Sequence, residues 1–169
     1  GDTSWDFDGQ EIFKRAVQGM VQASQAVMQK CGVTPDQIDL VVPHQANLRI
    51  IEAVVNKSGV PMDKCMLTVE RYGNMSAATV PVALNEAVEQ GRVKPGALIL
   101  MPAFGAGLTV CAHLVRWGER VTPLAATDAA LPPVKQSALD MVQEIRAKKA
   151  GAQERSGPGL HAPVFIESK

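Results

Sequence analysis

The sequence is poor in cysteine and aromatic residues, and it has no excess of either charge. Its 17 Lys and Arg residues balance 17 Asp and Glu residues, so we expect no broad cationic surface and no nucleic-acid partner. Cys31, Cys65 and Cys111 are odd in number and form no CxxC pair, which argues against a disulfide framework and against a zinc site. Unpaired cysteines suit a reducing compartment, and the polar opening GDTSWDFDG does not resemble a signal peptide. We therefore expect a cytoplasmic protein.

One stretch lacks Asp, Glu, Lys and Arg altogether: PGALILMPAFGAGLTVCAHLV, residues 95–115. It is long enough to span a bilayer as a helix. Pro102, Gly105 and Gly107 interrupt it near the middle, however, which favours two short apolar strands joined by a glycine turn. We therefore expect no membrane span, and the unbroken apolar character is typical of strands that an α/β protein buries on both faces.

The remaining patterns predict a layered α/β domain. Apolar residues recur at spacings of three and four from Ile12 to Val27, which indicates an amphipathic helix over 9–31 with Asp8 and Glu11 at capping-box spacing. Other predicted helices cover 45–57 and 77–90, with Pro81 tolerable in a first turn. Predicted strands cover 38–42, 66–69, 96–104 and 108–117, and a polar loop covers 71–76. The order is α-β-α-β-α-β-β.

The composition changes near residue 121. Residues 121–134 are rich in Ala and Pro without periodicity, and residues 137–149 can form a short helix. We expect a first domain over 1–120 and a C-terminal extension over 121–169, which lies over the core or is partly mobile. The alternative is that the helix docks on a partner.

Three loops, two polar and one glycine-rich, lie at predicted strand or helix ends, and ligands of open α/β sheets bind at such places. Each loop alone has a structural explanation. A single histidine after a strand is usually structural, Gly73-Asn74 is a common turn, and FGAG at 104–107 suits a hairpin. From residue patterns alone, the sequence is that of an α/β domain with a candidate His–Asn site. The loop residues are His44, Gln45, Asn47 and Arg49, then Tyr72, Gly73, Asn74 and Ser76, then 104–107.

Taken together, these motifs resemble a known family. PHQANLRI, YGNMSAATVPVAL and AFGAGLTV, preceded by DGQEIFKRAV, are similar to the C-terminal half of β-ketoacyl-acyl carrier protein synthase III, a thiolase-like condensing enzyme. The likeness runs from about Phe7 to Gly118 and leaves out the tail. It implies a thiolase-like layered α/β fold in which a mixed five-stranded sheet lies between helices. It also implies that the N-terminal half, which carries the family's nucleophilic cysteine, belongs to a longer polypeptide.

The resemblance implies an enzyme, an acyltransferase that carries out a decarboxylating Claisen condensation. An acyl-CoA primer would condense with malonyl-acyl carrier protein to give 3-oxoacyl-acyl carrier protein, at the start of fatty acid synthesis. His44 and Asn74 match the family's catalytic histidine and asparagine. They would donate N–H groups to the thioester oxygen of the malonyl group, and His44 would help activate the cysteine of the other half. The backbone N–H of Ala106 matches an oxyanion donor.

The same resemblance assigns substrate and partner contacts. Gly9, Phe13, Asn47 and Arg49 match positions that bind CoA or pantetheine, and Lys14, Arg49 and Lys57 match a rim that meets acyl carrier protein. No cofactor or metal is implied beyond the substrates acyl-CoA and the phosphopantetheine arm of acyl carrier protein. The implied partners are the N-terminal half, acyl carrier protein and a second copy in a homodimer. Three alternatives stay open: a related condensing enzyme of secondary metabolism with another acyl donor, a non-catalytic thiolase-like subunit, and a stand-alone α/β binding module.

Overall fold

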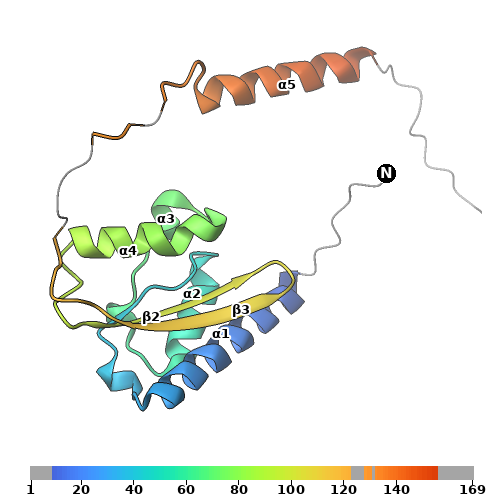
Figure 1. Ribbon diagram of the computed structural model, residues 1–169. Coiled ribbons are helices and arrows are strands. Elements are labelled where there is room, and N and C mark those ends of the chain that lie inside the picture. The colour runs from blue at the N-terminus through green and yellow to red at the C-terminus, as the bar shows by residue number, and fades with distance from the viewer. Residues whose placement is uncertain (1–8, 123–127, 131, 156–169) are drawn as a thin grey trace, which may run out of the picture. The chain divides into compact units, whose positions relative to one another are not determined.

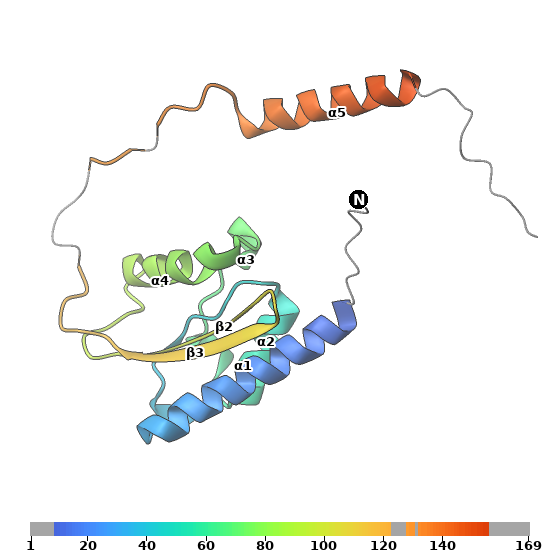
Figure 2. The same ribbon diagram turned by 45° about the vertical axis from the view of Figure 1, so that its right-hand side comes forward.

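The computed structural model describes residues 9–122, 128–130 and 132–155, and the chain divides into two compact units, 1–125 and 126–169. In the first unit, a small sheet lies between helices α1 and α2 on one face and α4 on the other (Figure 1; Figure 2). Its strand residues alternate accordingly: Val41 and Leu100 pack with the α1–α2 side, whereas Leu40 and Ile99 pack with α4. Strand residues 40–41 and 98–100 are buried and apolar on both faces, as in other α/β proteins. Residues 109–116 were expected to be buried in the same way, but they are exposed or half-buried.

The first two helices form one layer. Helix α1 spans Gly9–Cys31, as predicted, and its buried stripe packs on Ile50 and Val54 of α2. Asp8, the predicted cap of α1, lies outside the described residues. Helix α2 spans Leu48–Ser58 and begins later than the predicted position 45, because Asn47 is extended and its Oδ1 accepts a hydrogen bond from the N–H of Ile50 at 2.9 Å.

The sheet is mixed and has the order β1-β2-β3. Strand β1, Leu40–Val41, runs parallel to β2, Leu98–Gly105, and β2 runs antiparallel to β3, Thr109–Arg116. The two predicted strands joined by a glycine turn are therefore confirmed, as is the α/β class with a mixed sheet. Within the described residues the sheet has three strands and not five.

The predicted strand over 66–69 is wrong. Cys65 forms a single parallel bridge with Val41, and helix α3, Val69–Tyr72, begins after Thr68. The cause is Gln45, whose Oε1 accepts the N–H groups of Thr68 and Val69 at 2.8 and 3.1 Å. Those donors are then unavailable to a strand ladder. Helix α3 also takes the first two residues of the predicted polar loop.

Helix α4 spans Thr79–Glu89 after a 3₁₀ turn over Ser76–Ala78, and Pro81 lies in its first turn, where no intrahelical donor is lost. Glu86 of α4 is buried and forms an ion pair with Arg71 of α3. The helices α3 and α4 flank the loop that carries Asn74, and this ion pair holds them together. Short 3₁₀ turns at Pro35–Gln37 and Met62–Lys64 complete the connections.

The second unit contains helix α5, Ala138–Arg155. The hydroxyl of Ser137 accepts the N–H of Asp140 at 3.1 Å, and it donates to that carboxylate at 2.6 Å, so these residues cap the helix start. Leu139, Val142 and Ile145 are exposed along it. None of the helices in the described ranges has the length and apolarity to cross a membrane.

Candidate functional site

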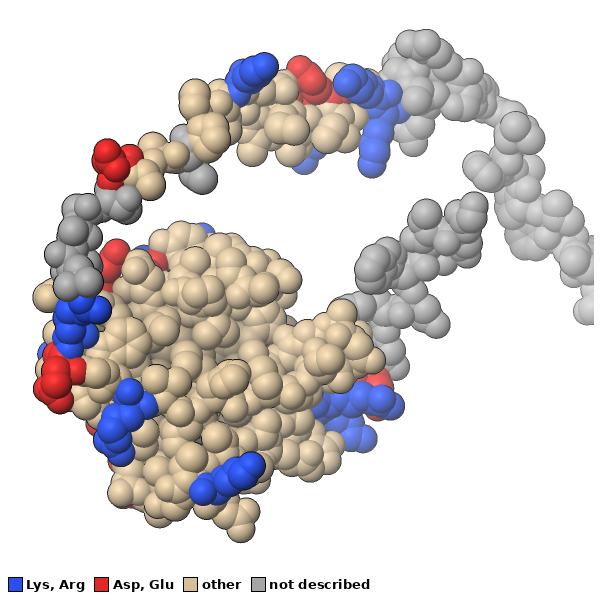
Figure 3. Space-filling view, viewed as in Figure 1, with Lys and Arg blue, Asp and Glu red and all other residues tan. Residues whose placement is uncertain are grey.

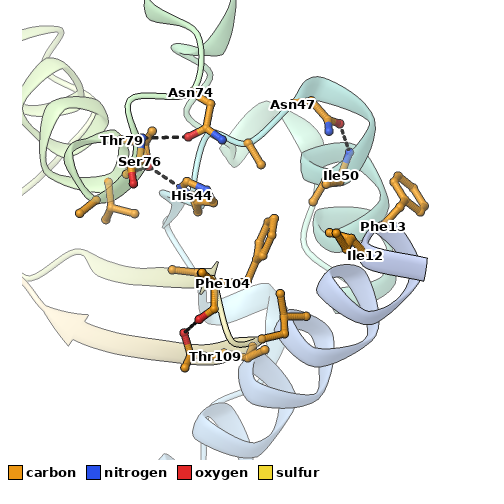
Figure 4. A pocket seen from close by; sticks show the side chains of 18 of the residues that line it. Ile12, Phe13, His44, Asn47, Ile50, Asn74, Ser76, Thr79, Phe104 and Thr109 are labelled. Atoms are coloured by element: carbon orange, nitrogen blue, oxygen red, sulfur yellow. Dashed lines mark hydrogen bonds between the residues drawn. The ribbon is translucent and has the colours of Figure 1, made fainter. Parts of the chain in front are cut away.

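A cavity of about 1130 Å³ opens between the start of α1, the loop before α2, the loop before α4 and the β2–β3 turn (Figure 4). Its walls are mostly apolar, and a few polar side chains from separate loops reach into it. Figure 3 shows one side of unit 1, where charged side chains lie mainly around the margin and the centre is uncharged. The polar lining side chains include His44, Asn47, Asn74, Ser76, Thr79 and Thr109.

His44 follows β1 and is 8% exposed. The backbone N–H of His44 donates to the carbonyl of Pro102 at 2.9 Å, which extends the parallel pairing of β1 and β2 up to the site. The imidazole meets Phe104 edge to face, with centroids 5.2 Å apart, and its Nδ1 lies 2.6 Å from the hydroxyl of Thr79. Burial lowers the pKa of His44, since desolvation disfavours the imidazolium. The ring is therefore neutral at pH 7.

The second nitrogen of His44, Nε2, has no hydrogen-bond partner in the part of the chain that the structure describes. Among the described residues, the fully buried side-chain atoms that lack a partner are the hydroxyl oxygens of Ser58 and Thr68, and Nε2 of His44 is not one of them. Because His44 lines the cavity, Nε2 is the ring nitrogen that a bound molecule can reach.

Asn74 lines the same cavity from the loop between α3 and α4, as Figure 4 shows. Gly73 before it has φ +65°, a conformation that favours glycine, and lets the chain turn after α3. The Oδ1 of Asn74 accepts the N–H of Ser76 at 2.9 Å. With its oxygen held in this way, the carboxamide presents its NH₂ group as the available donor.

Two polar residues hold this geometry in roles that the sequence did not predict, although one of them, Gln45, lies in a candidate loop. Gln45 is fully buried; its NH₂ donates to the carbonyls of Pro43 and Met66 at 2.9 and 3.1 Å, and its oxygen accepts two N–H groups at the start of α3. It thus joins the His44 loop to the segment before Asn74. A polar side chain between His44 and a helix start was visible in the sequence, but its partners lie 21 to 24 positions away.

Thr79 is the other missed residue. It is fully buried at the start of α4 and bonds to His44, 35 positions earlier in the chain. The signal available in the sequence was its place on the apolar stripe that continues through Ala83 and Ala87. A hydroxyl on such a stripe needs a buried partner.

The other predicted site residues divide into two groups. Gly9, Phe13, Asn47, Arg49 and Ala106 line the cavity, whereas Lys14 and Lys57 are exposed on α1 and α2 and do not line it. The Oδ1 of Asn47 accepts one hydrogen bond in capping α2.

The β2–β3 turn suits its residues. Gly107 has φ +133°, and a Cβ there would meet Thr109, so this position requires glycine. Among the described non-glycine residues, Ser76 alone has positive φ, which means that Ala106 adopts a conformation that alanine tolerates.

The cysteines differ in their surroundings. Cys65 is buried, and desolvation raises the pKa of its thiol to about 12, although Arg92 acts in the opposite direction. Cys111 is exposed and lines the cavity. No group of three or more metal-ligating side chains occurs in the ranges that the structure covers.

Residues 28–117 match the sequence profile described as 3-oxoacyl-[acyl-carrier-protein (ACP)] synthase III C terminal. The chain is 51% identical over 144 residues to beta-ketoacyl-[acyl-carrier-protein] synthase III 2 of Vibrio cholerae, which is 85% of this chain and 40% of that protein. It also resembles the crystal structure of 3-oxoacyl-[acyl-carrier-protein] synthase III from Aquifex aeolicus, with TM-score 0.65, 48% identity, and coverage of 66% of this chain and 36% of that one.

A further solved structure is the priming β-ketosynthase of a polyketide biosynthetic pathway. Its TM-score is 0.63 at 37% identity, covering 67% of this chain and 34% of the other. The chain therefore spans about two fifths of the length of the curated relatives it matches first. The fold is thiolase-like, as the family resemblance implied. Profile, relatives and structures agree, and the chain belongs to the 3-oxoacyl-[acyl-carrier-protein] synthase III family, of which it corresponds to the C-terminal region.

Proposed function

We propose that this chain supplies the histidine and asparagine of an acyltransferase that starts fatty acid synthesis. The enzyme condenses an acyl-CoA primer with malonyl-acyl carrier protein and releases carbon dioxide. The observation that supports this most is the shared cavity: His44 and Asn74, from loops 30 positions apart, line one apolar space. One of them is a neutral imidazole, and the other is a carboxamide with its donors available.

The first half-reaction needs a thiol that this chain does not supply in the family's motif. We propose that a cysteine of the N-terminal half attacks the acyl-CoA carbonyl and becomes acylated. His44 assists by handling the thiol proton through its accessible Nε2, and the backbone N–H of Ala106 contributes to the oxyanion site.

The second half-reaction develops negative charge on the thioester oxygen of malonyl-acyl carrier protein as carbon dioxide leaves. Asn74 suits the stabilisation of that charge, because an amide N–H cannot be titrated away near neutral pH. Removing one preorganised donor of this kind typically costs roughly 2.7–4 kcal/mol.

The cavity also accommodates the rest of the substrates. Gly9, Phe13, Asn47 and Arg49 line it and are proposed to contact CoA or the pantetheine arm. Lys14 and Lys57 are exposed cations outside the lining, and with Arg49 they form the proposed rim for an acidic carrier protein. The proposal includes a homodimer of the complete polypeptide, and three unpaired cysteines support a cytoplasmic location.

Electrostatic stabilisation of this kind needs a dry site, and Asn74 is exposed in this chain. We therefore propose that the N-terminal half both supplies the cysteine and closes the cavity. The test is a hybrid enzyme in which this chain replaces the C-terminal region of the Vibrio cholerae relative. We expect the hybrid to form 3-oxoacyl product from acyl-CoA and malonyl-acyl carrier protein, and the chain alone to form none. An inactive hybrid that is folded and dimeric would overturn the proposal.

The likeness to a priming β-ketosynthase favours a second candidate, a condensing enzyme of secondary metabolism with a different primer. The same hybrid separates the two when it is supplied with acetyl-CoA and with longer acyl-CoA primers. Fatty acid initiation predicts a higher kcat/KM for acetyl-CoA, and the alternative predicts a preference for the longer primers.

A further inference from the structure

An unbroken series of hydrogen bonds joins the two proposed catalytic side chains behind the cavity. It runs from Asn74 through the backbone of Ser76 to the hydroxyl of Thr79, and from there to His44. The three heavy-atom distances are 2.9, 3.0 and 2.6 Å. Figure 4 shows the first and last of these contacts beside the cavity wall.

Ser76 sits at the centre of this series because of its backbone conformation. Its φ of +56° is unusual for a residue other than glycine. In this conformation its N–H donates to Asn74 and its carbonyl accepts from Thr79. The backbone of Ser76 therefore fixes the direction of two hydrogen bonds, the one to Asn74 and the one from Thr79.

The number of available hydrogens decides which atoms of Thr79 and His44 donate and which accept. The hydroxyl of Thr79 has a single hydrogen, and the carbonyl of Ser76 can only accept, so this hydrogen belongs to the Thr79–Ser76 bond. The oxygen of Thr79 is then an acceptor toward His44, and the contact at 2.6 Å requires a hydrogen on Nδ1. If Thr79 donated to His44 instead, its hydroxyl oxygen and the carbonyl oxygen of Ser76 would face each other at 3.0 Å with no hydrogen between them.

We propose that Thr79 is the positioning residue that holds neutral His44 in its Nδ1–H tautomer, so that the cavity meets a lone pair on Nε2 and an N–H donor on Asn74. The two groups are thus of opposite hydrogen-bond character, and the relay through Ser76 sets both. The family resemblance implied instead that both residues donate to the same oxygen.

The catalytic consequence rests on the proposed function. In the acylation step, Nε2 takes the proton of the cysteine thiol, the sulfur forms its bond to the acyl carbon, and the carbon–sulfur bond to CoA breaks. The departing CoA thiolate then takes the proton from Nε2, which restores the neutral ring. In the decarboxylation step, the carbon–carboxylate electron pair moves onto the thioester oxygen, and Asn74 is the side chain of this chain that donates to it.

The tautomer itself can be measured without any activity. Long-range proton–nitrogen NMR correlations of the ¹⁵N-labelled full chain, recorded at mildly alkaline pH, distinguish a protonated from an unprotonated Nδ1. The chain has three histidines, and loss of one set of signals in His44→Gln assigns His44. The exposed His113 is an internal reference.

We expect wild-type His44 to carry its hydrogen on Nδ1, and Thr79→Ser, which retains the hydroxyl, to do the same. Thr79→Val has nearly the same shape but no acceptor, and we expect it to lose this tautomer while the signals of His113 stay unchanged. An Nε2–H ring in the wild type, or an unchanged tautomer in Thr79→Val, would overturn the proposal. An inactive hybrid enzyme would not affect this result, so the two proposals fail separately.

Discussion

At the scale of single residues, the buried imidazole of His44 makes the stability of the chain depend on pH. Its pKa in the native state lies below the ordinary value of roughly 6.5, which the unfolded chain retains. As the pH falls through that value, the unfolded state binds a proton that native His44 resists, and the free energy of unfolding decreases. The contribution of neutral His44 to the free energy of unfolding is fully present above about pH 6.5. It decreases as the pH falls from there to the lowered pKa of the native state.

We expect the free energy of unfolding of the wild type, minus that of His44→Gln, to decrease as the pH is lowered below about 6.5. Urea unfolding at a series of pH values measures it, and contributions of the other titrating groups cancel in the difference. A flat difference, or one that grows on acidification, would show that His44 is not desolvated as described.

Gln45 stabilises the fold through the four hydrogen bonds of its buried side-chain amide. Gln45→Met keeps the volume but removes the four hydrogen bonds that the buried amide makes with backbone groups, and a buried group left unpaired costs about 1–3 kcal/mol. We expect a loss of at least ~2 kcal/mol in urea unfolding. Gln22→Met, on the exposed side of α1, is the matched control and should stay within about 0.5 kcal/mol. Equal effects at both positions would argue against the described role of Gln45.

At the scale of elements, the approach of α1 to β3 depends on Gly19. A Cβ at this position would lie 2.8 Å from a methyl group of Val110. Alanine gains about 1 kcal/mol over glycine in helix propensity, and this clash opposes the gain. We expect Gly19→Ala to be more favourable in a Val110→Ala background than in the wild type, by about 0.5–3 kcal/mol in a double-mutant cycle. Additive effects would mean that the helix and strand do not meet there.

What the sequence could predict differs between elements for a physical reason. Helix α1 and the strands β2 and β3 follow local periodicity and turn residues, so they were predicted almost to the residue. The segment 66–69 was assigned wrongly because its apolar residues suit a strand, whereas a buried amide 23 positions earlier takes its donors. His44 and Asn74 were proposed from their motifs and line one cavity, whereas Thr79 was not proposed, because its contact with His44 exists only once α4 lies beside β1.

At the scale of the whole molecule, the buried apolar residues of the described core lie between Ala16 and Leu100. The apolar side chains of α5 are exposed instead. We expect a chain that ends at residue 125 to unfold in urea with the same free energy as the full chain, within about 0.5 kcal/mol. Fluorescence of the tryptophans, which both chains share, reports the transition. A loss above about 1 kcal/mol would show that the tail stabilises the first unit.

The central claim is that this chain brings a histidine and an asparagine to one substrate, with Asn74 as the donor to the charge that forms on decarboxylation. The most direct test is to measure the two half-reactions separately in the hybrid enzyme with and without Asn74→Ala. We expect release of carbon dioxide from malonyl-acyl carrier protein to fall by about 10²–10³-fold, while acylation of the cysteine changes little. Undiminished carbon dioxide release in Asn74→Ala would contradict the account.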